Sequence, residues 1–97
     1  MTIKYKYNED ISIHELKEYI DKTYDEHYSK DKFQATEFII DSGHGEGFCI
    51  GNIMKYAQRY GKKDGYCRKD LLKVLHYGII ALHNHDIKRG DNNEVKW

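Results

Sequence analysis

The chain has 97 residues, no proline and a formal net charge of zero, with 16 lysines and arginines balanced by 16 acidic residues. This length suits a single domain, which we place at residues 1–97. No segment approaches the roughly 20 apolar residues of a membrane span, and residues 1–10 lack the apolar core of a signal peptide. We therefore expect a cytoplasmic protein without a membrane partner. A chain this short has a modest core, so we also expect a homo-oligomer.

Charge is distributed unevenly along the chain. Residues 1–46 hold six lysines against eleven acidic residues, whereas residues 47–73 hold seven lysines and arginines against two aspartates. A basic segment that follows an acidic one concentrates small anions near its own surface. Long nucleic acid would require a basic excess over the whole domain, so we expect no partner of that kind.

Hydrophobic periodicity predicts a mainly α fold, a small helical domain of about four helices. Apolar residues alternate with polar ones over residues 2–7, which would form at most one short N-terminal strand. Ser12 and Glu15 have the spacing of a capping box at the start of the first helix. The helical segments predicted in chain order are 12–24, 30–41, 48–60 and 68–86.

The last two predicted helices each separate into an apolar and a polar side. In the third, Asn52, Lys55 and Arg59 align on the polar side, and the last two are four residues apart, so their cationic groups can converge. In the fourth, Asp70, Lys73 and Tyr77 form a polar flank. Beside that flank, the sequence predicts a buried apolar stripe of Leu71, Leu72, Leu75, Ile79 and Leu82.

Folded as a helical hairpin, these two segments would surround a phosphate-sized hollow. Lys62 and Lys63 in the connection would add charge, and Tyr56 and Tyr77 would offer faces on which a base could stack. The alternative is an ordinary solvated helix face. Gly51 favours a binding role slightly, because a glycine inside a helix costs roughly 1 kcal/mol relative to alanine, and close packing or close ligand approach would offset that cost.

Histidines and cysteines do not predict a metal site. His83 and His85 would point about 200° apart on a helix, so they cannot chelate one ion together. Cys49 and Cys67 are too far apart in sequence for a CxxC pair, and Cys49 falls on an apolar arc typical of a core position.

The segment "FCIGNIMKYAQRYGKKDG" followed by "KDLLKVLHY" resembles the SaV-like family of small bacteriophage proteins, and the resemblance extends over about residues 24–82. It implies a phage protein in the host cytoplasm. One branch of the family resembles a phage nucleotide kinase that phosphorylates deoxynucleoside monophosphates, which would imply ATP and Mg²⁺ as cofactors. The family usually has an acidic residue just before the matched Asp70, where this chain has Lys69. The matched positions are Gly51, Asn52, Lys55, Tyr56, Arg59, Gly61, Lys62, Lys63, Asp70, Leu71, Lys73 and Tyr77.

Three functions follow as hypotheses, each with a small nucleotide or an acidic protein as partner. The first is kinase-like phosphoryl transfer, in which Asp70 would be the catalytic residue, although the chain has no GxxxxGK[ST] loop. The second is a non-catalytic sponge that sequesters host immune signalling nucleotides, including cyclic ones, and needs no acid–base pair. The third is an adaptor that binds a host protein. The sequence leaves open whether the protein is an enzyme. The predicted nucleotide-binding residues are Asn52, Lys55, Tyr56, Arg59, Lys62, Lys63, Lys73 and Tyr77.

Overall fold

The computed structural model describes residues 2–26, 29–62 and 65–90, with only the backbone described for 29–33. Four helices follow one another: α1 (Glu9–Asp25), α2 (Ser29–Asp41), α3 (Gly45–Arg59) and α4 (Arg68–Arg89). The predicted mainly helical fold is confirmed. Residues 2–7 form no strand, so the short N-terminal strand is absent from the described part of the chain.

Charges at the helix ends agree with the helix dipole, which favours acids at the N-terminus and bases at the C-terminus. In α1, Glu9 and Asp10 lie in the first turn and Lys22 lies in the last. In α4, Asp70 lies in the first turn, and Lys88 and Arg89 lie in the last. The local sequence therefore supports each of these helices before any tertiary contact is made.

Two predicted helix starts were wrong. α1 begins at Glu9 rather than after Ser12, because Asn8 adopts a left-handed conformation (φ 58°) and acts as the N-cap residue. Asparagine tolerates this conformation better than most residues. Glu15 therefore lies inside the helix, where its carboxylate accepts two hydrogen bonds from Arg68 instead of closing a capping box. α3 begins at Gly45, three residues before the predicted start at Phe48.

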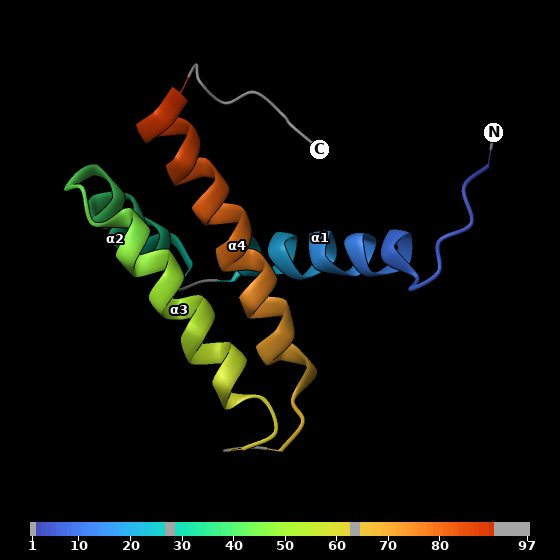
Figure 1. Ribbon diagram of the computed structural model, residues 1–97. Helices are drawn as coiled ribbons and strands as arrows, with labels where there is room; N and C mark the ends of the chain where they lie inside the picture. Colours follow the sequence, from blue (N-terminus) through green and yellow to red (C-terminus); the bar gives the residue numbers. More distant parts are fainter. Residues whose placement is uncertain (1, 27–28, 63–64, 91–97) are drawn as a thin grey trace.

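The antiparallel pair α3 and α4 forms the centre of the molecule (Figure 1). α1 crosses behind α4 in this view and extends away from the pair, while α2 packs against α3 and α1. Gly45 permits close approach of the two central helices, because a Cβ atom there would collide with the Asn84 side chain of α4. The turn between them depends on Gly61, whose φ is +84° and whose amide donates a hydrogen bond to the Gly65 carbonyl (2.9 Å).

The core is small. Cys49 is the one hydrophobic side chain that is fully buried among the described residues, as its place on the apolar arc predicted. The apolar stripe predicted to be buried on α4 is instead largely exposed, since Leu72 alone among its members is less than 40% exposed. The exposed fractions are 41% for Leu71, 48% for Leu75, 44% for Ile79 and 64% for Leu82.

Candidate functional site

Two lysines from different helices meet at one tyrosine ring. Lys55 on α3 places its Nζ 5.2 Å from the centroid of the Tyr56 ring, and Lys73 on α4 places its Nζ 4.8 Å from the same centroid. The two ammonium groups are therefore no farther apart than the sum of these distances. Neither ammonium has a carboxylate of the described residues within ion-pair distance. Cation–π contacts stabilise each lysine by roughly 0.5–1 kcal/mol at an exposed site, but they leave its positive charge uncompensated.

The Tyr56 ring is held in place by a second tyrosine. Tyr77 on α4 stacks against it with a centroid separation of 6.0 Å and an interplanar angle of 9°. Phe48 on α3 packs edge-on against Tyr77, with centroids 5.8 Å apart. Burial, with smaller effects from Tyr56 and Cys49, raises the pKa of the Tyr77 hydroxyl above its ordinary value. We call Lys55, Tyr56, Lys73 and Tyr77 the lysine–tyrosine cluster.

Arg59 does not join this cluster as a free cation. Its Nε lies 3.8 Å from Oδ1 of Asp70, a carboxylate that is only 4% exposed. The Asp70 carboxylate lies in the first turn of α4, where the helix dipole stabilises a negative charge. Arg59 and Asp70 thus join the end of α3 to the start of α4.

Three other residues predicted for the site lie elsewhere or outside the described residues. Asn52 donates a hydrogen bond from its side-chain amide to the Phe48 carbonyl of its own helix (2.9 Å). Lys62 is exposed and forms an isolated β-bridge with Gly65 in the interhelical turn. Lys63 lies outside the described residues. The structure thus brings four of the predicted residues together. Lys73 and Tyr77 also line a small hollow on the described surface, and Lys55 does not line it.

Gly51 lies one turn before Lys55 on α3. A Cβ atom at this position would have no heavy atom within 4 Å, so the protomer itself does not require a glycine here. Close helix packing, one of the two explanations for this residue, is therefore excluded within the described protomer. The open backbone beside Lys55 leaves space for something else to approach.

A family of proteins of unknown function, DUF3310, matches residues 22–78, more than half of the chain. The chain belongs to the DUF3310 family. The match includes all four residues of the lysine–tyrosine cluster, the Arg59–Asp70 pair and Gly51. No curated protein and no solved structure matches the chain. The resemblance to SaV-like phage proteins stays a prediction.

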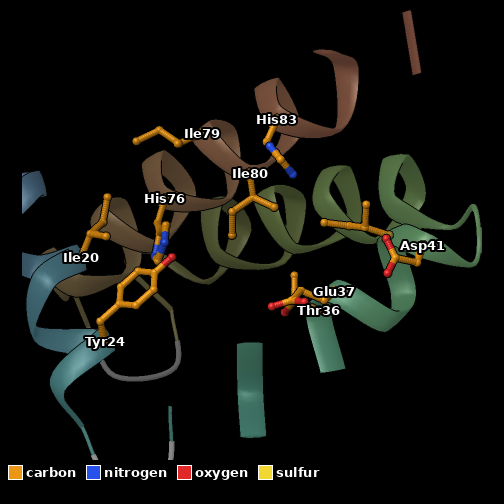
Figure 2. Close-up of a pocket in the computed structure, with 10 residues that line it drawn as sticks. Ile20, Tyr24, Thr36, Glu37, Asp41, His76, Ile79, Ile80 and His83 are labelled. Carbon is orange, nitrogen blue, oxygen red and sulfur yellow. The ribbon is translucent and has the colours of Figure 1, made fainter. Parts of the chain in front are cut away.

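This DUF3310 protein has a second feature that the sequence did not indicate, a groove of about 520 Å³ between α1, α2 and α4. Figure 2 shows His76, Ile80 and His83 of α4 on one wall, opposite Glu37 and Asp41 of α2. Because side chains of three separate helices build it, no local pattern could have revealed it. The same holds for Phe48, whose contact with Tyr77 depends on the packing of α3 against α4.

Neither a metal cluster nor a membrane span is found in the described part of this DUF3310 chain. No group of three or more histidines, cysteines and acidic residues gathers closely enough there to hold an ion. None of the helices over residues 9–25, 29–41, 45–59 and 68–89 combines the length and apolar character needed to cross a bilayer.

Proposed function

We propose that the chain binds a phosphate-bearing nucleotide at the lysine–tyrosine cluster. The observation that supports this most strongly is the approach of two uncompensated ammonium groups, from separate helices, to one tyrosine ring. Two ammonium groups over one ring repel each other, and a phosphate bound between them would replace that repulsion with charge-assisted hydrogen bonds. The ligand would therefore complete an arrangement that is electrostatically unfavourable when empty.

The aromatic neighbours favour a nucleotide over inorganic phosphate. Tyr56 and Tyr77 provide a rigid, parallel pair of rings directly beside the cations. Rings of this kind offer a base apolar contact area at little entropic cost, and base–aromatic stacking contributes roughly 1–3 kcal/mol per base. The open backbone at Gly51 would let the ligand approach α3 closely.

The position of Asp70 favours binding without chemistry. A catalytic carboxylate must reach the proton that it abstracts, but Asp70 is 4% exposed and lies next to Arg59. Sequestration of a nucleotide requires no accessible carboxylate. We therefore place the sponge hypothesis ahead of kinase-like transfer to nucleoside monophosphates, with the latter as the second candidate.

Calorimetric titration of the purified chain with mono-, di-, tri- and cyclic nucleotides tests this proposal. We expect saturable binding of at least one of them, weakened about 100-fold or more in the double variant Lys55→Met/Lys73→Met, because each charge-assisted hydrogen bond contributes roughly 1.5–3 kcal/mol. Lys22→Met, on α1, is the matched control and should bind as the parent chain does. Equal affinity in the double variant would overturn the proposal that nucleotides bind at the lysine–tyrosine cluster.

Incubation with ATP, Mg²⁺ and each deoxynucleoside monophosphate separates the two candidates. Recovery of every nucleotide unchanged supports sequestration. Formation of diphosphates would instead support the kinase, and it would move Asp70 back into consideration as a catalytic group.

A further inference from the structure

One side of the α3–α4 pair carries exposed apolar side chains, which we call the outer face and define by Ile50, Met54, Leu71, Leu75 and Leu82. The exposed fraction of these residues runs from 41% for Leu71 to 64% for Met54 and Leu82. They lie four residues apart on α3, and four and seven residues apart on α4, which places them on one side of each helix.

Contacts between the two helices show that both stripes lie on the same side of the pair. Arg89 continues the α4 stripe by two turns beyond Leu82, and its guanidinium lies 3.5 Å from the carboxylate of Glu46, one turn before Ile50 on α3. Ile50 also shares a shallow hollow with Ala81 and His85 of α4. The α3 stripe and the α4 stripe are therefore adjacent.

α1 and α2 pack elsewhere on this pair. α1 contacts α4 through Tyr19, whose ring meets His76 edge-on at 6.0 Å, and through the pair of Glu15 with Arg68. The groove shared with α2 uses His76, Ile80 and His83. These three residues lie about 100–160° around the α4 helix from the centre of the Leu71, Leu75 and Leu82 stripe, and Ile79, which also lines the groove, lies between the two sides. No described helix of the protomer covers the outer face.

The whole chain exposes more surface than a folded monomer of its mass should. Its accessible area is 8047 Å², whereas a compact monomer of this mass exposes about 5,800 Å². Its radius of gyration is 15.3 Å, against about 12.5 Å expected for a compact domain of this length. The exposed residues 2–8 contribute to this excess of roughly 2,000 Å².

We infer that the outer face binds the outer face of a second copy of this chain, in a two-fold symmetric dimer. Its five large side chains expose on the order of 500 Å² of apolar surface, at the upper end for a single patch on a monomer and most of what each partner of a dimer buries. None of the five is charged, so the face can meet a copy of itself without burying like charges. Gly78 lies among the leucines, and a Cβ atom added there would have no heavy atom within 4 Å, which leaves room for the partner helix.

Sedimentation equilibrium of the full chain from about 1 to 100 µM tests the dimer. We expect a dimer for the parent chain and at least tenfold weaker association for Leu75→Glu, because the introduced carboxylate would be buried against its symmetry mate. Phe38→Glu is the matched control, since Phe38 on α2 is 73% exposed and lies outside the face. A parent chain that stays monomeric over this range, or a Leu75→Glu variant that dimerises as the parent does, would overturn the inference.

Two variants of opposite charge at Leu75 test whether misfolding, rather than a lost interface, explains weaker association. Mixing Leu75→Glu with Leu75→Lys should restore a heterodimer, which an unfolded variant cannot do. If circular dichroism shows that Leu75→Glu has lost its helices, Leu82→Glu decides instead, because Leu82 is already 64% exposed in the protomer. A folded Leu82→Glu variant with parental association would contradict the outer-face dimer. The result is independent of the nucleotide proposal, which involves a different side of the helix pair.

Discussion

At the scale of single residues, the charges of the molecule fall into two groups. Arg59 and Asp70 form a structural pair, whereas the charges of Lys55 and Lys73 are available to a ligand. Asp70 is buried with Arg59 as its neighbour, whereas Lys55 and Lys73 lie over a tyrosine ring without a described carboxylate. Removing one member of a buried pair leaves the other charge uncompensated, which is costly. The two groups of charges should therefore respond to substitution in different ways.

We predict that Asp70→Asn lowers the free energy of unfolding by about 1–3 kcal/mol, because the Arg59 guanidinium loses its neighbouring carboxylate. Urea denaturation followed by circular dichroism measures this change. Asp10→Asn, at the exposed first turn of α1, is the control and should have a much smaller effect. If Asp70→Asn were as stable as the parent chain but had lost nucleotide turnover, a catalytic role for Asp70 would replace the structural one.

A second residue-scale prediction concerns Tyr77, whose pKa is raised mainly by burial. Because the folded-state pKa lies above that of the unfolded chain, Tyr77 contributes stability that is intact below the ordinary tyrosine pKa of about 10 and is lost as the pH rises through the folded value. Absorbance at 295 nm should show a late-ionising tyrosine that is missing in Tyr77→Phe. Superimposable titrations of the two proteins would contradict the burial of this hydroxyl.

At the scale of elements, the α3–α4 turn depends on the conformation of Gly61. A Cβ atom there would lie 2.7 Å from the Tyr66 ring, and φ is +84°. Gly61→Ala should therefore destabilise the protein by about 1–3 kcal/mol. Gly47→Ala is the control, because it lies in α3 with open space around it and should stabilise by about 0.5 kcal/mol. Thermal melts of the two variants that shift in the same direction would refute this role of Gly61 in the turn.

α1 is attached to α4 in part by the bidentate pair of Arg68 and Glu15, at 2.8 and 2.7 Å. The hydrogen bonds from Arg68 lower the pKa of Glu15. This contribution is therefore present above the unfolded-state value and is lost as the pH falls through the lower, folded-state value. We predict that Glu15→Gln accelerates hydrogen exchange of the α1 amides at neutral pH, whereas Glu18→Gln leaves it unchanged. Equal exchange in both variants would mean that apolar contacts alone hold α1.

The four helices were predictable from the sequence because periodicity and end charges act locally. The start of the first helix was not, because Asn8 caps it through a left-handed backbone, whereas the capping-box pattern at Ser12 indicates a side-chain cap. The cluster was partly predictable, since Lys55 and Tyr56 adjoin in sequence and Lys73 and Tyr77 are one turn apart. The hydrogen bond of Asn52 to its own helix and the burial of Asp70 depend on side-chain packing, which a single sequence does not specify.

At the scale of the whole molecule, the exposed leucine stripe of α4 explains why the prediction of a buried face was wrong for the protomer. Periodicity shows that one side of a helix is apolar, but it does not show what covers that side. If a second copy covers it, unfolding and dissociation are linked. The midpoint of thermal unfolding should then rise with protein concentration between about 1 and 100 µM, and a constant midpoint would argue that the protomer is stable alone.

Nucleotide binding at the lysine–tyrosine cluster is tested most directly by residue-resolved NMR. Titration of the ¹⁵N-labelled chain with the tightest-binding nucleotide should shift the amide signals of Gly51, Lys55, Tyr56, Lys73 and Tyr77 first and most. Signals from the groove of α1, α2 and α4 should move little. Saturating shifts confined to that groove, or no shifts at millimolar nucleotide, would contradict a nucleotide site at the cluster.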